Sequence, residues 1–155
     1  MPRQDKPEKI VMFAYGTNIS QEQMLNHCEN AVLLGYGTLP NYQLKFQGFR
    51  KHAIANLEKK RGAEIPVAVY ELEPEGRFTI DNYEKFPYNY AKKKVVAMLN
   101  GEKKKGFIYI LKKKLEPGVP SEAYMNALRA AYWEADMDQI YIDNALKEVE
   151  DNNVK

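Results

Sequence analysis

Residues 9–24 read KIVMFAYGTNISQEQM and pass from an apolar run to a helix-like run within a few positions. Residues 10–15 are apolar, β-branched or aromatic, which predicts a buried first strand. Ser20 is followed three residues later by a glutamine, and this capping-box spacing predicts a short helix over residues 20–29. We therefore expect a sharp strand-to-helix turn at the Tyr-Gly-Thr-Asn sequence between them.

The composition of this turn has two interpretations. Gly16 lets the backbone approach a ligand closely, and the first amides of a helix lack internal partners and bind anions. Thr17 and Asn18 add groups that donate and accept hydrogen bonds. These features favour a site for a small anionic group such as a carboxylate. On spacing alone, an ordinary turn in which Asn18 caps the helix explains the residues better.

The rest of the chain predicts strands first and helices afterwards. Asn100-Gly101 favours a type I′ hairpin, and Ser121 is placed to cap a helix that buries Met125, Leu128 and Tyr132 on one face. This order predicts an α+β fold with a mixed or antiparallel sheet, which can curl into a small barrel flanked by helices. The expected strands cover residues 31–36, 42–46, 53–57, 67–72, 93–99 and 106–111, the expected helices cover 121–132 and 137–149, and a helical turn is expected over 77–85.

Length and composition predict one globular domain. The chain has 155 residues, 45% of them hydrophobic. We expect a flexible lead-in over residues 1–8, a domain over residues 9–149 and a polar tail over residues 150–155. The net charge of +2 gives no reason to expect a nucleic-acid or membrane partner. Cys28, the single cysteine, cannot form an internal disulfide, and the apolar runs are too short to cross a bilayer, so we expect a cytoplasmic protein.

Three lysine runs, at residues 92–94, 103–105 and 112–114, add a third possibility. A basic patch could bind RNA, but aromatic residues do not alternate with these lysines as stacking platforms would require. The runs are more typical of solvated strand edges that resist aggregation. His27 and His52 lack partners at metal-ligand spacing, so we expect no metal site.

A second chemical motif lies in residues 80–95, IDNYEKFPYNYAKKKV. Glu84 stands among aromatic residues, and burial in such surroundings raises the pKa of a carboxyl. A general base that works near neutral pH needs such a shift. Composition alone favours an exposed glutamate beside Lys85 in a turn.

Together the two motifs resemble those of a known family. Tyr15-Gly16-Thr17-Asn18 resembles the Tyr-Gly-Ser-Asn signature of the γ-glutamylcyclotransferase superfamily, which includes avirulence-induced-gene-like proteins. Asp81-x-x-Glu84 with Phe86-Pro87-x-x-Tyr90 resembles its Leu-Asp-x-x-Glu-Gly-Tyr-Pro-x-x-Tyr segment. The resemblance covers roughly residues 10–146.

This resemblance implies a small barrel with flanking helices that splits a γ-glutamyl amide by internal attack and releases 5-oxoproline. It implies that Glu84 is the catalytic acid/base and that Tyr15, Gly16, Thr17 and Asn18 hold the γ-glutamyl group. Tyr90 and Tyr109 are implied to line the pocket. The resemblance implies no metal and no cofactor, a small-molecule γ-glutamyl substrate, and compatibility with a homodimer.

Two departures from the family pattern leave an alternative open. Thr17 replaces a serine and keeps its hydroxyl, whereas Lys85 replaces a glycine directly after Glu84. A positive charge close to a carboxylate lowers its pKa. A non-catalytic module that binds a small ligand with the same fold is therefore the alternative to the enzyme.

Overall fold

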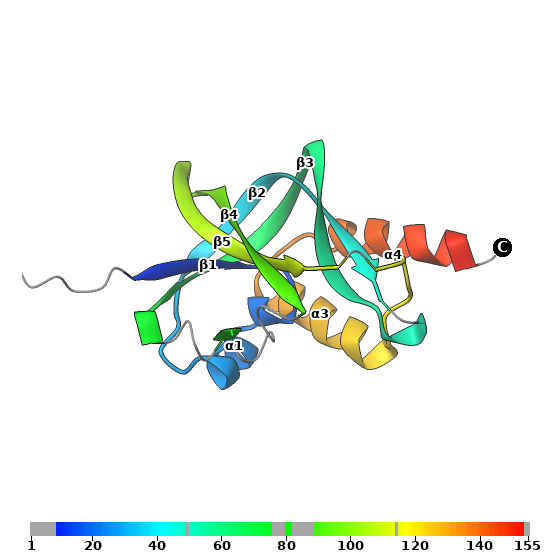
Figure 1. The fold of residues 1–155 in the computed structure, drawn as a ribbon, viewed down its shortest axis with the longest axis horizontal. Coiled ribbons are helices and arrows are strands. Elements are labelled where there is room, and N and C mark those ends of the chain that lie inside the picture. The colour runs from blue at the N-terminus through cyan, green and yellow to red at the C-terminus, as the bar shows by residue number, and fades with distance from the viewer. Residues whose placement is uncertain (1–8, 49, 76–79, 82–88, 114, 154–155) are drawn as a thin grey trace, which may run out of the picture.

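In the described part of the chain, five strands form a closed barrel with the order β1-β3-β2-β4-β5 (Figure 1). The structure is a computed structural model that describes residues 9–48, 50–75, 80–81, 89–113 and 115–153. β1 pairs with β5 in parallel and closes the barrel, while the other pairings are antiparallel. The predicted α+β fold with a mixed barrel is therefore confirmed. The strands are β1 (Ile10–Ala14), β2 (Val32–Gln47), β3 (Ile54–Leu72), β4 (Tyr90–Leu99) and β5 (Glu102–Leu111).

The strands β2 and β3 are longer than expected, because each joins two segments that the sequence separates. The register of their ladder shifts between Pro40 and Tyr42, where Asn41 has a φ of 66°. Such an irregularity bends a strand without ending its hydrogen-bonded ladder. Pro66 lies inside β3, opposite Thr38 of β2.

The hairpin between β4 and β5 forms at the predicted place. Asn100 and Gly101 have φ values of 52° and 80°, as a type I′ turn requires at both central positions. The ladder on either side runs from Leu99 opposite Glu102 to Tyr90 opposite Leu111. This register brings Lys92 opposite Tyr109, a pairing that matters for the site below.

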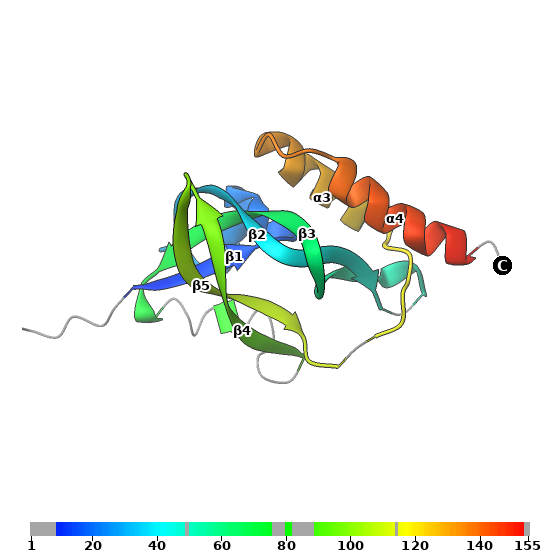
Figure 2. The ribbon, with the colours of Figure 1, turned by 90° about the horizontal axis from the view of Figure 1, so that it is seen from above.

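The helices lie outside the barrel (Figures 1 and 2). The 3-10 turn η1 (Thr17–Ile19) precedes α1 (Gln21–His27), and a second 3-10 turn, η2 (Arg50–His52), lies between β2 and β3. α3 (Glu122–Glu134) and α4 (Ile140–Asn153) lie together beside the barrel (Figure 2). Residues 150–153 therefore belong to a helix and not to the polar tail expected there.

The predicted caps and core residues can be compared directly. The Oγ atoms of Ser20 and Ser121 accept hydrogen bonds from the N–H groups of Gln23 and Tyr124, at 3.4 and 3.1 Å. Both caps are thus confirmed, as is the burial of the predicted α3 face, Met125, Leu128 and Tyr132. On the first helix, Met24 is buried and so is Cys28 directly after the helix, whereas Leu25 is 43% exposed.

Two ion pairs join the helices to each other and to the barrel. Lys45 of β2 lies 2.6 Å from Glu148 of α4, and Arg129 of α3 lies 2.8 Å from Asp143 of α4. The α3–α4 pair is thereby held against the outside of β2. In the described residues, no helix is both long and apolar enough to cross a membrane.

Several predictions fall on residues that the structure does not describe. The lead-in over residues 1–8 and most of the helical turn over residues 77–85 lie outside the described ranges. Glu84, Lys85, Phe86 and Pro87 lie outside them as well. Asp81, three positions before Glu84, is described.

Candidate functional site

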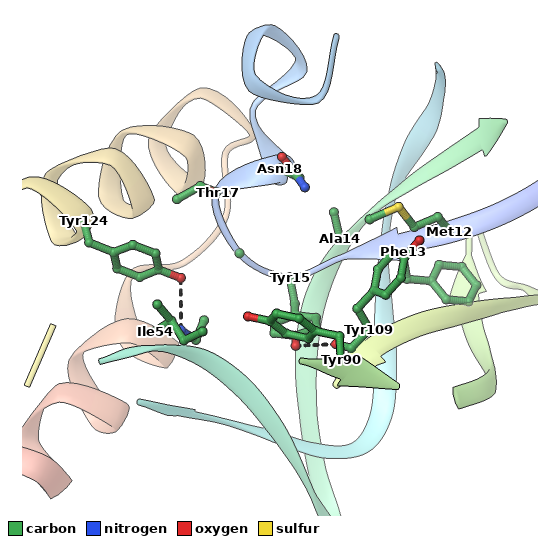
Figure 3. Close-up of a pocket in the computed structure, with 12 residues that line it drawn as sticks. Met12, Phe13, Ala14, Tyr15, Thr17, Asn18, Ile54, Tyr90, Tyr109 and Tyr124 are labelled. Atoms are coloured by element: carbon green, nitrogen blue, oxygen red, sulfur yellow. Dashed lines mark hydrogen bonds between the residues drawn. The ribbon is translucent and has the colours of Figure 1, made fainter. Parts of the chain in front are cut away.

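A cavity of about 150 Å³ lies where β1 ends, between the barrel and α3 (Figure 3). It is lined by six of the seven residues that the sequence suggested for the site, and Glu84 is the exception because it lies outside the described residues. Described residues of both sequence motifs, Tyr15–Asn18 of the first and Tyr90 of the second, thus line one cavity. Its described lining is Met12, Phe13, Ala14, Tyr15, Gly16, Thr17, Asn18, Ile54, Ala55, Tyr90, Tyr109 and Tyr124.

The turn after β1 forms one wall of the cavity. The N–H of Ile19 donates to the Gly16 carbonyl at 3.0 Å, and the N–H of Ser20 donates to the Thr17 carbonyl at 3.1 Å. These bonds close a 3-10 turn, and α1 begins only after it. The hydroxyl of buried Tyr70 donates to the Ile19 carbonyl at 3.1 Å, and burial raises the pKa of this phenol, which keeps it protonated as a donor.

This geometry corrects two predictions about the turn. The start of α1 does not line the cavity, so its first amides are not the anion site that the sequence suggested. Asn18 is not a helix cap, because Ser20 caps α1 and η1 has no side-chain cap. Asn18 is instead buried and lines the cavity.

Gly16 leaves the cavity open on the turn side. An ideal Cβ at this position would lie 3.7 Å from Oη of Tyr124 and 3.9 Å from Cβ of Ala55, and both residues line the cavity. Any side chain here would therefore point into the space a ligand would fill. The expected close approach of backbone to ligand is available at this glycine.

Three tyrosines form a second wall, called here the tyrosine wall: Tyr15 directly after β1, Tyr90 at the start of β4 and Tyr109 near the end of β5 (Figure 3). The hydroxyl of Tyr15 donates to the backbone carbonyl of Tyr109 at 2.5 Å. The rings of Tyr90 and Tyr109 meet edge to face with centroids 6.5 Å apart. The wall thus links the end of β1 to the β4–β5 hairpin.

Behind this wall lies a charged group that the sequence did not reveal. The hydroxyl of Tyr109 donates to Oδ1 of Asp81, and Nζ of Lys92 lies 2.7 Å from the same oxygen. Side-chain exposure is only 21% for Lys92 and 16% for Asp81. The interpretation of the lysine runs as solvated edges is therefore wrong for Lys92, although Lys94, Lys103 and Lys105 are exposed.

Sequence reasoning also missed the α3 side of the cavity. Oη of Tyr124 accepts a hydrogen bond from the N–H of Ala55 at 3.0 Å, so that the ring lies across from the β1 turn (Figure 3). Tyr124 is four residues before Leu128 on the helix, and residues at this spacing share a face. That spacing could have placed Tyr124 beside the predicted core stripe, but it could not have indicated a cavity.

Neither of the two histidines lines this cavity, and the cysteine does not line it either. Burial lowers the pKa of His27 and raises that of the Cys28 thiol, so neither shift favours a reactive cysteine. Within the described ranges, no three histidine, cysteine, aspartate or glutamate side chains are grouped as metal ligands would be.

Comparison with known proteins places the chain among cyclotransferase-like proteins. The family model described as gamma-glutamyl cyclotransferase, AIG2-like, matches residues 12–133. A solved gamma-glutamyl cyclotransferase superimposes with a TM-score of 0.78 at 18% identity, covering 92% of this chain and 87% of its own. An uncharacterised human protein superimposes with a TM-score of 0.77 at 19% identity, and the match covers 96% of this chain and 99% of the human one. A yeast gamma-glutamyl cyclotransferase specific to glutathione superimposes with a TM-score of 0.63 at 11% identity, and the match covers 92% of this chain and 96% of the yeast one. Among curated proteins, no match is found.

Proposed function

The chain belongs to the AIG2-like gamma-glutamyl cyclotransferase family, and on this premise we propose that it cleaves a small γ-glutamyl compound. In the proposed reaction, the α-amine of the substrate attacks the γ-carbonyl carbon and forms the new C–N bond of 5-oxoproline. The original γ-amide C–N bond breaks, and an amino acid or amine leaves.

The observation that carries this proposal is that described residues of both family motifs line one small cavity. The turn from Tyr15 to Asn18 and the strand residue Tyr90 line the same space of about 150 Å³. A cavity of this volume is comparable to one that holds a benzene ring, and it is smaller than typical drug-sized pockets. It suits a compact group such as the γ-glutamyl moiety.

The turn at Gly16 is the proposed binding surface for the γ-glutamyl group. Its backbone is open to the cavity, and Thr17 and Asn18 add side-chain donors beside it. Donors here could bind the α-carboxylate or stabilise the oxyanion that forms on the γ-carbonyl oxygen. The tyrosine wall would then lie along the carbon chain of the ligand.

Glu84 is the proposed acid/base. The α-amine must lose a proton before it attacks, and a carboxylate can take that proton and return it to the departing amine. Closure of a five-membered ring supplies the nucleophile at high effective molarity, so the site need not hold a second reactant. Supporting this role, Asp81, three positions earlier in the family motif, contacts the lining residue Tyr109.

The test is a panel of γ-glutamyl dipeptides and amines with direct detection of 5-oxoproline. We expect release from at least one compound, and a loss of at least a hundredfold in Glu84→Gln. Glu102→Gln, at an exposed glutamate on β5, is the matched control and should keep full activity. Undiminished release by Glu84→Gln with an intact fold would reject the assigned role.

The alternative is a binding module without turnover, favoured by the lysine that follows Glu84 in place of the family's glycine. A fold does not by itself fix a function. A melting temperature raised by 5-oxoproline, together with no turnover across the whole panel, would support this alternative over the enzyme.

A further inference from the structure

Lys92 differs from the other lysines of its run in its surroundings. Its ammonium lies 2.7 Å from Oδ1 of Asp81 and donates to Oδ2 at 2.8 Å, while Lys94 on the same strand is exposed. Removing two charges from water costs free energy unless they pair with good geometry. The contact of one ammonium with both carboxylate oxygens provides that geometry.

The barrel brings a third side chain to this ion pair. Lys92 of β4 lies opposite Tyr109 of β5, and directly opposite residues on an antiparallel pair share one face of the sheet. The ammonium nitrogen lies over two aromatic rings, 5.8 Å from the ring centroid of Tyr109 and 5.2 Å from that of Phe107. Asp81 accepts the hydroxyl of Tyr109 as well as the ammonium, so its carboxylate joins the other two groups.

This arrangement determines what Tyr109 offers to a ligand. Its hydroxyl donates to Asp81, its ring lines the cavity, and its backbone carbonyl accepts the hydroxyl of Tyr15. The ring of Tyr90 rests edge-on against it. The positions of all three wall tyrosines are thus connected to the carboxylate that Lys92 holds.

We propose that Lys92 is a positioning residue for the cavity: by holding the Asp81 carboxylate where it accepts the Tyr109 hydroxyl, it fixes the tyrosine wall against which the ligand lies. Lys92 acts through Asp81 and Tyr109 and does not contact the ligand. The nature of that ligand, a γ-glutamyl group or 5-oxoproline, rests on the proposed function. The position of the wall does not.

The test compares Lys92→Met, Lys92→Arg and the control Lys94→Met. Two quantities are measured: the NMR signals of the tyrosine rings, assigned through Tyr→Phe variants, and the dissociation constant for 5-oxoproline. We expect Lys92→Met to shift the ring signals of Tyr15 and Tyr109 and to weaken binding about tenfold, which is about 1.4 kcal/mol. Lys92→Arg, which keeps the charge and can pair with both carboxylate oxygens, should restore both quantities, and Lys94→Met should change neither.

A merely structural role would give a different result. Lys92→Met would then lower the melting temperature and leave the ring signals and the affinity of the folded protein unchanged, which would overturn the proposal. Failure of Lys92→Arg to restore the ring signals would overturn it too. If the unmodified protein binds and converts no compound in the panel, the proposed function fails, and the ring signals still decide the role of Lys92.

A double variant protects the test against misfolding. Lys92→Met alone leaves a carboxylate without its cation, whereas Lys92→Met with Asp81→Asn removes both charges and their burial cost. Asp81→Asn is also measured alone. Because Lys92 acts through Asp81, the double variant should show the same displaced ring signals as Lys92→Met. Its loss of affinity should be no larger than the larger of the losses in Lys92→Met and Asp81→Asn. Additive losses, or ring signals like those of the unmodified protein, would contradict the proposal.

Discussion

The hydroxyl of Tyr15, at the end of β1, donates to the backbone carbonyl of Tyr109 on β5, and this bond joins the two ends of the cavity wall. The two residues lie 94 positions apart in the chain and are both buried. β1 and β5 are also the strands whose parallel pairing closes the barrel. The contact therefore belongs both to the closure of the fold and to the surface of the site.

Tyr15→Phe tests this contact while keeping the ring in place. We expect a loss of about 1 to 2 kcal/mol in the free energy of unfolding, because a buried carbonyl loses a donor. Denaturant unfolding measures the loss. Tyr36→Phe, at a partly exposed tyrosine of β2, is the control and should change stability by less than about 0.5 kcal/mol. Equal losses in the two variants would mean that the Tyr15 bond contributes nothing specific.

Gly16→Ala tests whether the turn faces the ligand. The added methyl group would meet Tyr124 and Ala55 at ordinary contact distances, so the fold should persist. The methyl group would occupy cavity volume, and we expect the affinity for 5-oxoproline to fall at least tenfold. Calorimetric titration and thermal unfolding of the same sample separate the two effects.

Gly37→Ala provides the contrasting case. A Cβ at Gly37 would lie 2.3 Å from the backbone carbonyl of Met98, a contact that the strands can relieve only by moving apart. We expect this variant to lose about 1 to 3 kcal/mol of stability, as overpacked sites do. A Gly16→Ala variant that loses stability to the same degree and binds ligand normally would contradict the assignment of Gly16 to the site.

Local sequence signals predicted the parts of the fold that local chemistry controls. Asn100-Gly101 predicted the hairpin, and Ser20 and Ser121 predicted the two helix starts, because each signal acts within a few residues. The lengths of β2 and β3 could not be read in this way. Whether Asn41 ends a strand or only bends it depends on the neighbouring strand that continues the ladder.

The site residues also divide into those that a local motif marks and those whose role depends on the folded barrel. Tyr15 to Asn18 and Tyr90 were found because family motifs mark them, and Tyr109 because it lies on the strand after the hairpin. Lys92 was missed because three successive lysines look alike in sequence, and only the barrel determines which of them faces Asp81. Tyr124 was missed because its role depends on how α3 meets the barrel.

Tyr124→Phe tests the α3 side of the cavity. The N–H of buried Ala55 donates to the Tyr124 hydroxyl, and loss of this acceptor should cost about 1 to 2 kcal/mol of stability. Tyr141→Phe on α4 is the control, because Tyr141 is partly exposed and does not line the cavity. An unchanged hydrogen-exchange rate at the Ala55 amide in Tyr124→Phe would contradict the assigned bond.

The last prediction concerns two buried tyrosines and the alkaline limit of stability. Burial raises the pKa of Tyr70 and of Tyr132 above the ordinary value of 10.0. A phenol whose pKa is raised by folding contributes stability that is fully present below pH 10 and is lost as the pH rises above it, because the unfolded chain ionises first. We therefore expect the free energy of unfolding to fall above about pH 10.

The two residues should respond differently to loss of the hydroxyl at neutral pH. Tyr70→Phe removes the bond to the Ile19 carbonyl and should cost about 1 kcal/mol. The hydroxyl of Tyr132 has no hydrogen-bond partner within the described residues, so Tyr132→Phe should leave stability unchanged or raise it by up to about 1 kcal/mol. Denaturant unfolding near pH 7 measures both changes.

At alkaline pH both variants should gain stability relative to the unmodified protein, since each removes one phenol whose ionisation favours the unfolded chain. About one pH unit above 10, the difference in unfolding free energy by which Tyr70→Phe falls below the unmodified protein should narrow by about 1 kcal/mol. Tyr132→Phe should exceed the unmodified protein in unfolding free energy by a similar amount. The measurement is repeated there with unfolding curves in the same denaturant. A gap between Tyr132→Phe and the unmodified protein that stays constant from neutral to alkaline pH would show that this phenol ionises equally in both states, contrary to its burial.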